Sequence, residues 1–269
     1  MSFLRFFCRF AALIFWVLVA FCALILIQPF LGARGRDWLK WQWSRVLLRL
    51  SGIQIVGGGT PIAEGAVLLV SNHVSWLDIY LLNATRPTIF IAKSEIRRWP
   101  ILGWLVAGAD TIFIERASRH AVHKIGSAMQ SRFSRGQSVG LFPEGTTSPG
   151  FDLLPFYANL FEPARKAAVP IQPVALIFYY QGQRSDFAAF VGEETLLQNL
   201  RRVLGATGLM VEVEFLPPIW VPEDGEPPPR AELGRLARQA IHEALARRSS
   251  GSEPIGQQFW QRGCARSRG

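Results

Sequence analysis

Cysteine is scarce in this chain, and its scarcity excludes several kinds of site. The 269 residues include three cysteines, Cys8, Cys22 and Cys264. No pairing or metal-ligand spacing links them, so we expect neither a disulfide framework nor a zinc site. All three lie near the ends of the chain, far from the motifs described below, which argues against a cysteine nucleophile. His120 and His123 are three residues apart and lack an evident third ligand, so no metal is expected.

The sequence also lacks any recognised nucleic-acid-binding motif and any internal repeat. It is nevertheless strongly basic, with a net charge of +9 and a pI near 10.2. Such a charge requires an acidic partner or surface. Anionic phospholipid and a phosphorylated substrate explain it most economically, because the charge coexists with a long apolar segment. Nucleic acid is not an expected partner.

The apolar segment lies at the N-terminus. Residues from Phe10 to Ile27 carry no charged or polar side chain, and 18 residues is near the lower limit for a transmembrane helix. No convincing cleavage site follows, so residues 1–36 are predicted to be a retained anchor. More basic residues follow the run than precede it. This asymmetry predicts that the domain after the run lies on the cytoplasmic side of the cell inner membrane, while a re-entrant or monotopic hairpin stays open.

A second helix is predicted over residues 37–50, with Asp37 as its cap. Its apolar residues fall on one face, and Trp38 and Trp41 add interfacial rings beside basic side chains. We expect this amphipathic helix to lie on the membrane surface. The alternative is a helix whose apolar face packs on the protein core. The apolar face consists of Leu39, Trp43, Val46, Leu47 and Leu50.

Strand-like runs alternate with helical patterns over residues 51–248. This alternation predicts an α/β domain with a mostly parallel sheet flanked by helices. The clearest helices open at Ser118 and near Arg230, and the polar segment 249–269 is expected to be a disordered tail. The strand-like runs are Ile53 to Val56, Val67 to Val70, Thr88 to Ile91, Thr111 to Ile114, Ser138 to Phe142, Ile171 to Phe178 and Val211 to Phe215.

One histidine lies five residues before an aspartate, directly after the apolar run Ala66 to Val70. The run is typical of a buried strand, so His73 should stand at the C-terminal end of that strand, where open α/β sheets carry their chemistry. Asp78 can fix the tautomer of the imidazole and favour its protonated form. The pair could act as a general base on a hydroxyl. A core histidine and a helix-capping aspartate are the alternative.

Three further segments carry polar groups beside strand-like runs. The run Thr111 to Ile114 leads to Arg116, whose planar fork suits phosphate oxygens. The segment Phe142-Pro143-Glu144-Gly145-Thr146-Thr147-Ser148 can bring backbone amides and hydroxyls close to a polar head group. The segment Val169-Pro170-Ile171-Gln172-Pro173-Val174 enters a buried strand.

These segments, in the order Asn-His-x4-Asp, Phe-Ile-Glu-Arg, Phe-Pro-Glu-Gly-Thr and Val-Pro-Ile-x-Pro-Val, resemble the four blocks of the glycerolipid acyltransferase family. Its bacterial members include the 1-acylglycerol-3-phosphate acyltransferases. The resemblance covers roughly Leu39 to Leu216. It implies that His73 takes the proton from an acceptor hydroxyl and that Asp78 orients the histidine. The hydroxyl would attack the thioester of acyl-CoA or acyl-carrier protein directly, without an acyl-enzyme and without a further cofactor.

The resemblance also assigns the acceptor. It implies 1-acylglycerol 3-phosphate as the first candidate, giving phosphatidate. The implied substrate-binding residues are Lys93, Arg116, Glu144, Gly145, Thr146 and Thr147.

One position departs from the phosphatidate-forming pattern, which has arginine where this chain has Thr147. Loss of an arginine removes charge-assisted hydrogen bonds to a phosphate. Relatives with Thr-Thr here include enzymes for other lysolipids, so lyso-ornithine lipid is the alternative acceptor. The alternative of another class is a non-catalytic lipid-binding protein at the membrane surface. Oligomeric state and acyl length remain open.

Overall fold

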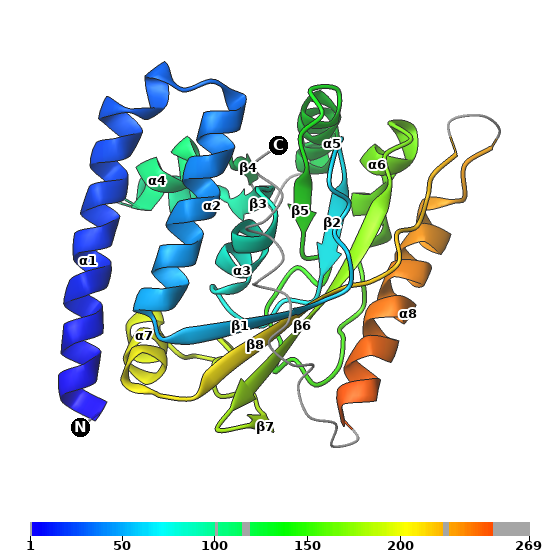
Figure 1. The fold of residues 1–269 in the computed structure, drawn as a ribbon. Coiled ribbons are helices and arrows are strands. Elements are labelled where there is room, and N and C mark those ends of the chain that lie inside the picture. Colours follow the sequence, from blue (N-terminus) through cyan, green and yellow to red (C-terminus); the bar gives the residue numbers. More distant parts are fainter. Residues whose placement is uncertain (1, 100–101, 115–118, 223–225, 250–269) are drawn as a thin grey trace, which may run out of the picture.

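The computed structural model describes residues 2–99, 102–114, 119–222 and 226–249. Arg116 and the predicted tail after Ser249 lie outside these ranges. Within the described residues, one sheet has the strand order β1-β8-β6-β2-β5-β3-β4, with β7 paired to β6 (Figure 1). The strands are β1 (Ile53–Gly58), β2 (Leu68–Ser71), β3 (Ile89–Lys93), β4 (Ile112–Ile114), β5 (Val139–Leu141), β6 (Ile171–Tyr180), β7 (Gln183–Arg184) and β8 (Leu209–Phe215).

The sheet is mostly parallel. β2 pairs in parallel with β5 and β6, and β3 pairs in parallel with β4 and β5. β8 runs antiparallel to β6, and β1 follows the direction of β8. The carboxyl ends of β2, β3, β4, β5 and β6 therefore meet at one edge. The predicted α/β class is confirmed, and each predicted strand is present with its ends moved by a few residues.

Helices cover both faces of this sheet, because β2 and β6 alternate buried apolar side chains between two cores. Leu68 and Val70 face a core shared with α5, α6 and α8, whereas Val67 and Leu69 face one shared with α2, α3 and α7. Short apolar strands buried on both faces are typical of parallel sheets. These helices, with α4 and the 3-10 turns, are α2 (Ala33–Leu50), α3 (Asp78–Thr85), α4 (Leu102–Gly108), α5 (Arg119–Phe133), α6 (Glu162–Lys166), α7 (Leu196–Gly205), α8 (Arg230–Ser249), η1 (Gln28–Phe30), η2 (Ser94–Arg98) and η3 (Ala158–Phe161).

Helix α2 starts four residues earlier than predicted. Its N-cap is Gly32, so the prediction that Asp37 caps the helix is wrong. Asp37 lies inside the first turns, where its carboxylate pairs with Lys40 at 2.8 Å. Part of the predicted apolar face packs on α3, with Leu47 only 3% exposed and the Trp43 ring 5.3 Å from that of Tyr80. The alternative, a helix whose apolar face packs on the protein core, thus holds for the part of α2 that contains Trp43 and Leu47.

Helix α1 (Ser2–Leu26) is long and apolar enough to cross a membrane, judged by length and composition alone. It is attached to the α/β domain at its N-terminal end. The Arg5 guanidinium donates to the Gly205 carbonyl at 3.0 Å, and that of Arg9 donates to the Leu204 and Ala206 carbonyls at 3.1 and 2.6 Å. Arginines at a helix C-terminus satisfy carbonyls that the helix leaves free. The two arginines thus hold α1 against α7.

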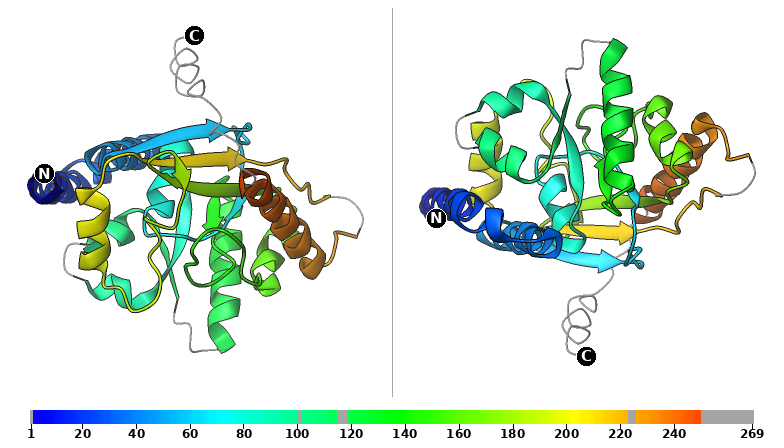
Figure 2. Two further views of the ribbon diagram at one scale, coloured as in Figure 1. Left: turned by 90° about the horizontal axis from the view of Figure 1, so that it is seen from below. Right: turned by 90° about the horizontal axis from the view of Figure 1, so that it is seen from above.

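The other end of α1 is attached as well. The amide of Gln28, just after α1, donates to the Gly108 carbonyl at the end of α4 at 2.7 Å. A Cβ at Gly108 would lie 2.0 Å from Leu24 Cδ1, so the glycine permits this close approach. Midway, the Trp16 indole donates to the Trp43 carbonyl at 3.2 Å. Helix α1 therefore runs along the domain, at the opposite end of the molecule from α8 (Figure 2).

The remaining surface of α1 is apolar and uncovered. Phe6 and Leu13 are the buried residues of this helix, at 9% and 8% exposure, and most of its other large side chains face outward. Exposed apolar patches of this size mark contact with a membrane or another protein. The outward side chains are Phe3, Leu4, Phe7, Ile14, Phe15, Leu18, Val19, Ile25 and Leu26.

Candidate active site

His73 and Asp78 form a hydrogen-bonded pair at the carboxyl edge of the sheet. β2 ends at Ser71, and α3 begins at Asp78, so the two residues flank the turn between strand and helix. His73 Nδ1 lies 2.7 Å from Asp78 Oδ2. The Asp78 side chain is fully buried, while that of His73 is 22% exposed. The buried carboxylate orients a ring whose other side reaches solvent.

The Asp78 carboxylate is held in place by backbone. Its Oδ2 also accepts from the Val74 and Ser75 amides at 2.7 and 2.9 Å. A carboxylate that accepts from Nδ1–H of a neutral histidine leaves Nε2 as the basic nitrogen. The turn thus fixes both the ring orientation and the tautomer that a general base requires.

Asn72 supports this turn from the other side. Its Nδ2 donates to the Leu176 carbonyl at 2.9 Å, and its Oδ1 accepts from the Leu176 amide at 2.8 Å. The fully buried side chain thereby continues the β2–β6 pairing one residue beyond Ser71. Asn72 ties the strand down immediately before the chain turns to present His73. Sequence reasoning gave this residue no role, because Leu176 is 104 positions away.

An aromatic wall backs the histidine. The Phe142 ring stacks on the His73 ring with centroids 4.2 Å apart and an interplanar angle of 13°. Phe90, on β3, stacks on the other side of Phe142 at 5.8 Å. The imidazole therefore cannot swing away from Asp78 on that side, and its outer edge is the part that remains exposed.

Glu144 has a different environment from the one predicted. The residue is 4% exposed, and its Oε1 accepts from the His73 amide at 2.8 Å. Its Oε2 accepts from the Leu154 amide at 2.9 Å. Burial raises the pKa of the Glu144 carboxyl, and the two amides oppose that rise. Both oxygens are engaged by backbone, so this side chain positions the His73 turn.

Replacement of Glu144 by glutamine should therefore affect stability and turnover together. Glutamine keeps one acceptor oxygen but places an NH2 group opposite a backbone N–H, which leaves that donor buried and unpaired. Such a group costs about 1–3 kcal/mol. We expect urea unfolding to show a free energy of unfolding lower by that amount, and we expect a fall in kcat with little change in acceptor KM. A rise in KM at constant kcat would instead indicate direct substrate contact.

Gly145 and Thr146 lie where the predicted acceptor-binding segment reaches the surface. Gly145 has φ +71°, and a Cβ there would lie 2.9 Å from the Tyr157 ring. A side chain would thus be strained both by the backbone and by its neighbour. Thr146 is exposed. The segment stays within reach of a ligand at the edge that carries His73.

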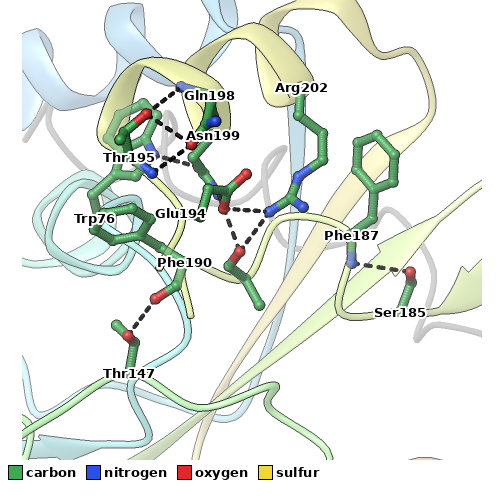
Figure 3. A network of polar contacts seen from close by, with 11 residues as sticks. Trp76, Thr147, Ser185, Phe187, Phe190, Glu194, Thr195, Gln198, Asn199 and Arg202 are labelled. Carbon is green, nitrogen blue, oxygen red and sulfur yellow. Dashed lines mark hydrogen bonds and ion pairs between the residues drawn. The ribbon is translucent and has the colours of Figure 1, made fainter. Parts of the chain in front are cut away.

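Thr147 is tied to a distant loop. Its hydroxyl donates to the Phe190 carbonyl (Figure 3). The Phe190 amide donates in turn to the Val74 carbonyl at 2.9 Å. The Thr147 hydroxyl thus donates its proton to a partner within the protein. The segment 185–195 had no role in the sequence prediction, because it has no charged or aromatic pattern that indicates a site.

The same loop is fixed to α7 by a polar network (Figure 3). The Trp76 indole donates to Asn199 Oδ1 at 2.9 Å, and Asn199 Nδ2 donates to Glu194 at 2.9 Å. Arg202 pairs with Glu194 at 2.8 Å and also donates to the Ala189 carbonyl. The network connects the His73 turn, the Thr147 segment and the helix that holds α1.

The structure describes neither the side chain of Lys93 nor any part of Arg116, the two cationic residues predicted to bind substrate. Lys93 is the last residue of β3, opposite Ile114 on β4, and its side chain lies outside the described part. Arg116 follows β4 and also lies outside it. The structure brings His73, Asp78 and the 144–147 segment together at one edge, and β3 and β4 end at the same edge.

A Gly-x-Ser-x-Gly spacing occurs at Gly136–Gly140, but its environment is not that of a hydrolase nucleophile. Ser138 precedes β5 and therefore lies at the opposite edge of the sheet from His73. It is 6% exposed, and its hydroxyl accepts from Arg86 Nε at 3.1 Å. A nucleophile elbow places an exposed serine on a strand-to-helix turn. Ser138 is a buried structural residue.

Comparison with known proteins identifies the family. A sequence model described as Acyltransferase matches residues 53–177. A lyso-ornithine lipid O-acyltransferase of Pseudomonas aeruginosa is 38% identical over 206 residues, or 77% of each chain. This chain belongs to the acyltransferase family. A 1-acyl-sn-glycerol-3-phosphate acyltransferase of Neisseria gonorrhoeae is 39% identical over 161 residues, covering 60% of this acyltransferase and 63% of that protein.

The fold of this acyltransferase also has a solved counterpart. The crystal structure of a 1-acyl-sn-glycerophosphate acyltransferase from Thermotoga maritima matches with a TM-score of 0.67 and 19% identity, covering 95% of this chain and all of that one. The likeness confirms the mixed sheet with flanking helices. The predicted membership of the acyltransferase family is confirmed as well.

Proposed function

We propose that this acyltransferase moves a fatty acyl group from a thioester to the free hydroxyl of a lysolipid, with His73 as general base. The observation that carries the proposal is the 2.7 Å contact between His73 Nδ1 and the buried Asp78 carboxylate at the open edge of the sheet. It leaves Nε2 available to a hydroxyl. The relatives named for lysolipid acceptors support the substrate class.

The proposed reaction has two proton transfers. Nε2 of His73 accepts the proton of the acceptor hydroxyl while that oxygen attacks the thioester carbonyl, and Asp78 stabilises the imidazolium that forms. The tetrahedral intermediate then collapses with cleavage of the C–S bond. The imidazolium returns its proton to the departing thiolate of coenzyme A or the carrier protein. His73 is neutral again, and no acyl-enzyme forms.

An apolar cavity beside the site fits the acyl chain. It has a volume of about 300 Å³ and lies among α1, α2, α3, α4 and β3. Tyr80 and Phe90 line it, and Phe90 is separated from His73 by one stacked ring, that of Phe142. Its outer wall includes the α1 residues Trp16, Val19 and Ala23. A chain entering from a membrane around α1 would reach the aromatic rings that back His73 without crossing water.

The acceptor we propose first is a lysolipid without a phosphomonoester, as in lyso-ornithine lipid. Thr147 replaces the arginine of the phosphatidate-forming pattern, and its hydroxyl donates to Phe190. The position therefore offers no charge to a phosphate. The match to the lyso-ornithine lipid enzyme also extends over more of the chain than the Neisseria match. 1-Acylglycerol 3-phosphate is the second candidate, favoured by the identity of 39% to that relative.

An acceptor panel separates the two candidates. Purified protein is given labelled acyl donor with either lysolipid, and kcat/KM is compared. We expect a preference for lyso-ornithine lipid, and Thr147→Arg should shift the ratio toward 1-acylglycerol 3-phosphate by about tenfold or more, the size of one charged hydrogen bond. Thr147→Val is the matched control, because it removes the hydroxyl without adding charge. An unchanged ranking in Thr147→Arg would show that this position does not read the head group.

We further propose that α1 lies within one leaflet of the membrane. Both of its ends contact the same α/β domain, through α7 and α4. A helix that crossed the bilayer would separate its ends by about 30 Å of hydrocarbon, so only one end could stay on the domain. The basic side chains beside α1 support placement of the domain on the cytoplasmic face of the inner membrane.

Cysteine labelling tests this placement. Ser2→Cys and Gly32→Cys, each made in a chain whose three native cysteines are serine, mark the two ends of the helix. We expect an impermeant maleimide to label both from the same side of sealed vesicles. Labelling of the two positions from opposite sides would establish a transmembrane α1 and contradict the proposal.

A further inference from the structure

A basic surface lies beside β4, the outermost strand of the sheet. It is a groove of about 750 Å³ between η2, β4 and α5. Five cationic residues line it, and its described lining contains no carboxylate. Neither the proposed chemistry nor the acyl-chain cavity uses these side chains. The cations are Arg97, Arg98, Lys124, Arg132 and Arg135.

Most of this charge is not neutralised by the described part of the chain. Arg98, Lys124 and Arg135 form no ion pair with another described residue, whereas Arg132 lies 3.5 Å from Asp110. Arg97 sits over the Phe113 ring, with its guanidinium carbon 5.7 Å from the ring centroid. Uncompensated cations of this density repel one another. An anionic ligand from outside the chain would relieve that repulsion.

The groove is continuous with the apolar membrane-facing surface. Trp99 follows η2 and is 45% exposed, and Trp104 on α4 is 65% exposed. Trp104 in turn contacts Phe21 of α1, with ring centroids 6.5 Å apart. Tryptophans flanked by basic residues are typical of the level at which lipid head groups meet the hydrocarbon. The order along the surface is therefore apolar helix, tryptophans, cations.

We propose that the groove between η2 and α5 binds the head groups of anionic phospholipids and gives the protein a second, sequence-distant membrane contact. Helix α1 supplies apolar insertion, and the groove supplies attraction to negatively charged lipid. Contacts at two separated elements fix the rotation of the domain on the membrane, which a single helix leaves free. The inference rests on the proposed membrane attachment and is independent of the proposed acyl transfer.

Vesicle binding tests the groove directly. The purified full chain is sedimented with vesicles of phosphatidylcholine alone and with an equimolar mixture of phosphatidylcholine and phosphatidylglycerol. The variant Arg98→Gln/Lys124→Gln/Arg135→Gln should lose on the order of 10- to 100-fold of the preference for the anionic vesicles, since each surface cation contributes about fivefold. Its binding to phosphatidylcholine should be unchanged, because α1 is intact.

Two controls isolate the groove. Arg230→Gln/Arg235→Gln/Arg247→Gln removes the same charge from exposed positions on α8, none of which lines the groove, and should keep the preference. Arg98→Lys/Arg135→Lys keeps the charge of the groove and should behave like wild type, which guards against misfolding. The wild-type preference should also fall with salt.

Equal losses in the two charge-removed variants would overturn the proposal, because net charge alone would then explain binding. A groove variant that keeps its vesicle preference and loses activity only with a carrier-protein donor would also overturn it, and would assign the groove to that carrier. Because vesicle binding is measured without turnover, a failed acyltransferase assay leaves the result intact.

Discussion

Replacing His73 with alanine should lower kcat by about 10²–10⁴-fold, the contribution of a positioned general base. The side chain is the only part of the His73 turn removed, because Glu144 and Ser148 hold its backbone rather than its ring. The ring is partly exposed, so its loss leaves a small surface cavity beside Phe142. Initial rates with saturating donor and lysolipid measure the effect.

The control tests whether the His73→Ala variant keeps its fold and its membrane binding. His73→Ala should bind vesicles as wild type does and should unfold at nearly the same urea concentration. His73→Gln keeps much of the side-chain volume and some hydrogen bonding but supplies no base, so it should be as slow as the alanine variant. Turnover within a few-fold of wild type in either variant would remove His73 from the mechanism.

Replacing Asp78 with asparagine should lower kcat by roughly 10- to 100-fold, because the hydrogen bond to His73 loses its charge, and a charged hydrogen bond is worth about 1.5–3 kcal/mol. The asparagine side chain keeps one oxygen for the Val74 and Ser75 amides, so the turn survives. The same oxygen still accepts from His73 Nδ1–H, so the tautomer is kept, but the neutral amide no longer supports the imidazolium. The acceptor KM should change little.

Asp78→Ala distinguishes charge from shape. Alanine leaves the Val74 and Ser75 amides without their acceptor, so it should also destabilise the fold, whereas asparagine should not. If Asp78→Asn were fully active, or if it raised KM while kcat stayed constant, the carboxylate would have no part in the proton transfer.

The sheet could be predicted from the sequence because its central strands are short apolar runs buried on both faces. Val67 to Val70 and Ile171 to Phe178 are examples, and each is present within a few residues. The reversed direction of β1 and β8 could not be predicted, because hydrophobic pattern carries no information on strand direction. The two-residue strand β7 is too short for any pattern.

The contact between His73 and Asp78 could be predicted because both residues lie within one turn. A spacing of five residues brings a side chain at a strand end next to one at a helix start, so His73 and Asp78 needed no long-range information. The contacts that support this turn join residues far apart in the sequence and could not be predicted. Asn72 with Leu176 and Thr147 with Phe190 join residues 104 and 43 positions apart.

The type of a side chain predicted neither the contacts of Glu144 nor the orientation of helix α1. Glutamate in a substrate-binding block indicates an acceptor for ligand groups, yet Glu144 turns both oxygens to backbone amides. Hydropathy indicated a membrane helix over Phe10 to Ile27 without indicating its orientation. The arginines before that run are decisive, since Arg5 and Arg9 bind α7 carbonyls and hold the helix along the domain.

The central claim is that a lysolipid hydroxyl, activated by His73, attacks the thioester directly. A rapid-quench experiment with donor labelled in its acyl group tests this most directly, using wild type and His73→Ala with and without lysolipid. The account predicts that label passes from donor to diacyl product in wild type, that none becomes attached to protein, and that His73→Ala forms product at least about 10²-fold more slowly. Label held covalently on the protein before lysolipid is added, or free fatty acid as the sole product, would contradict it.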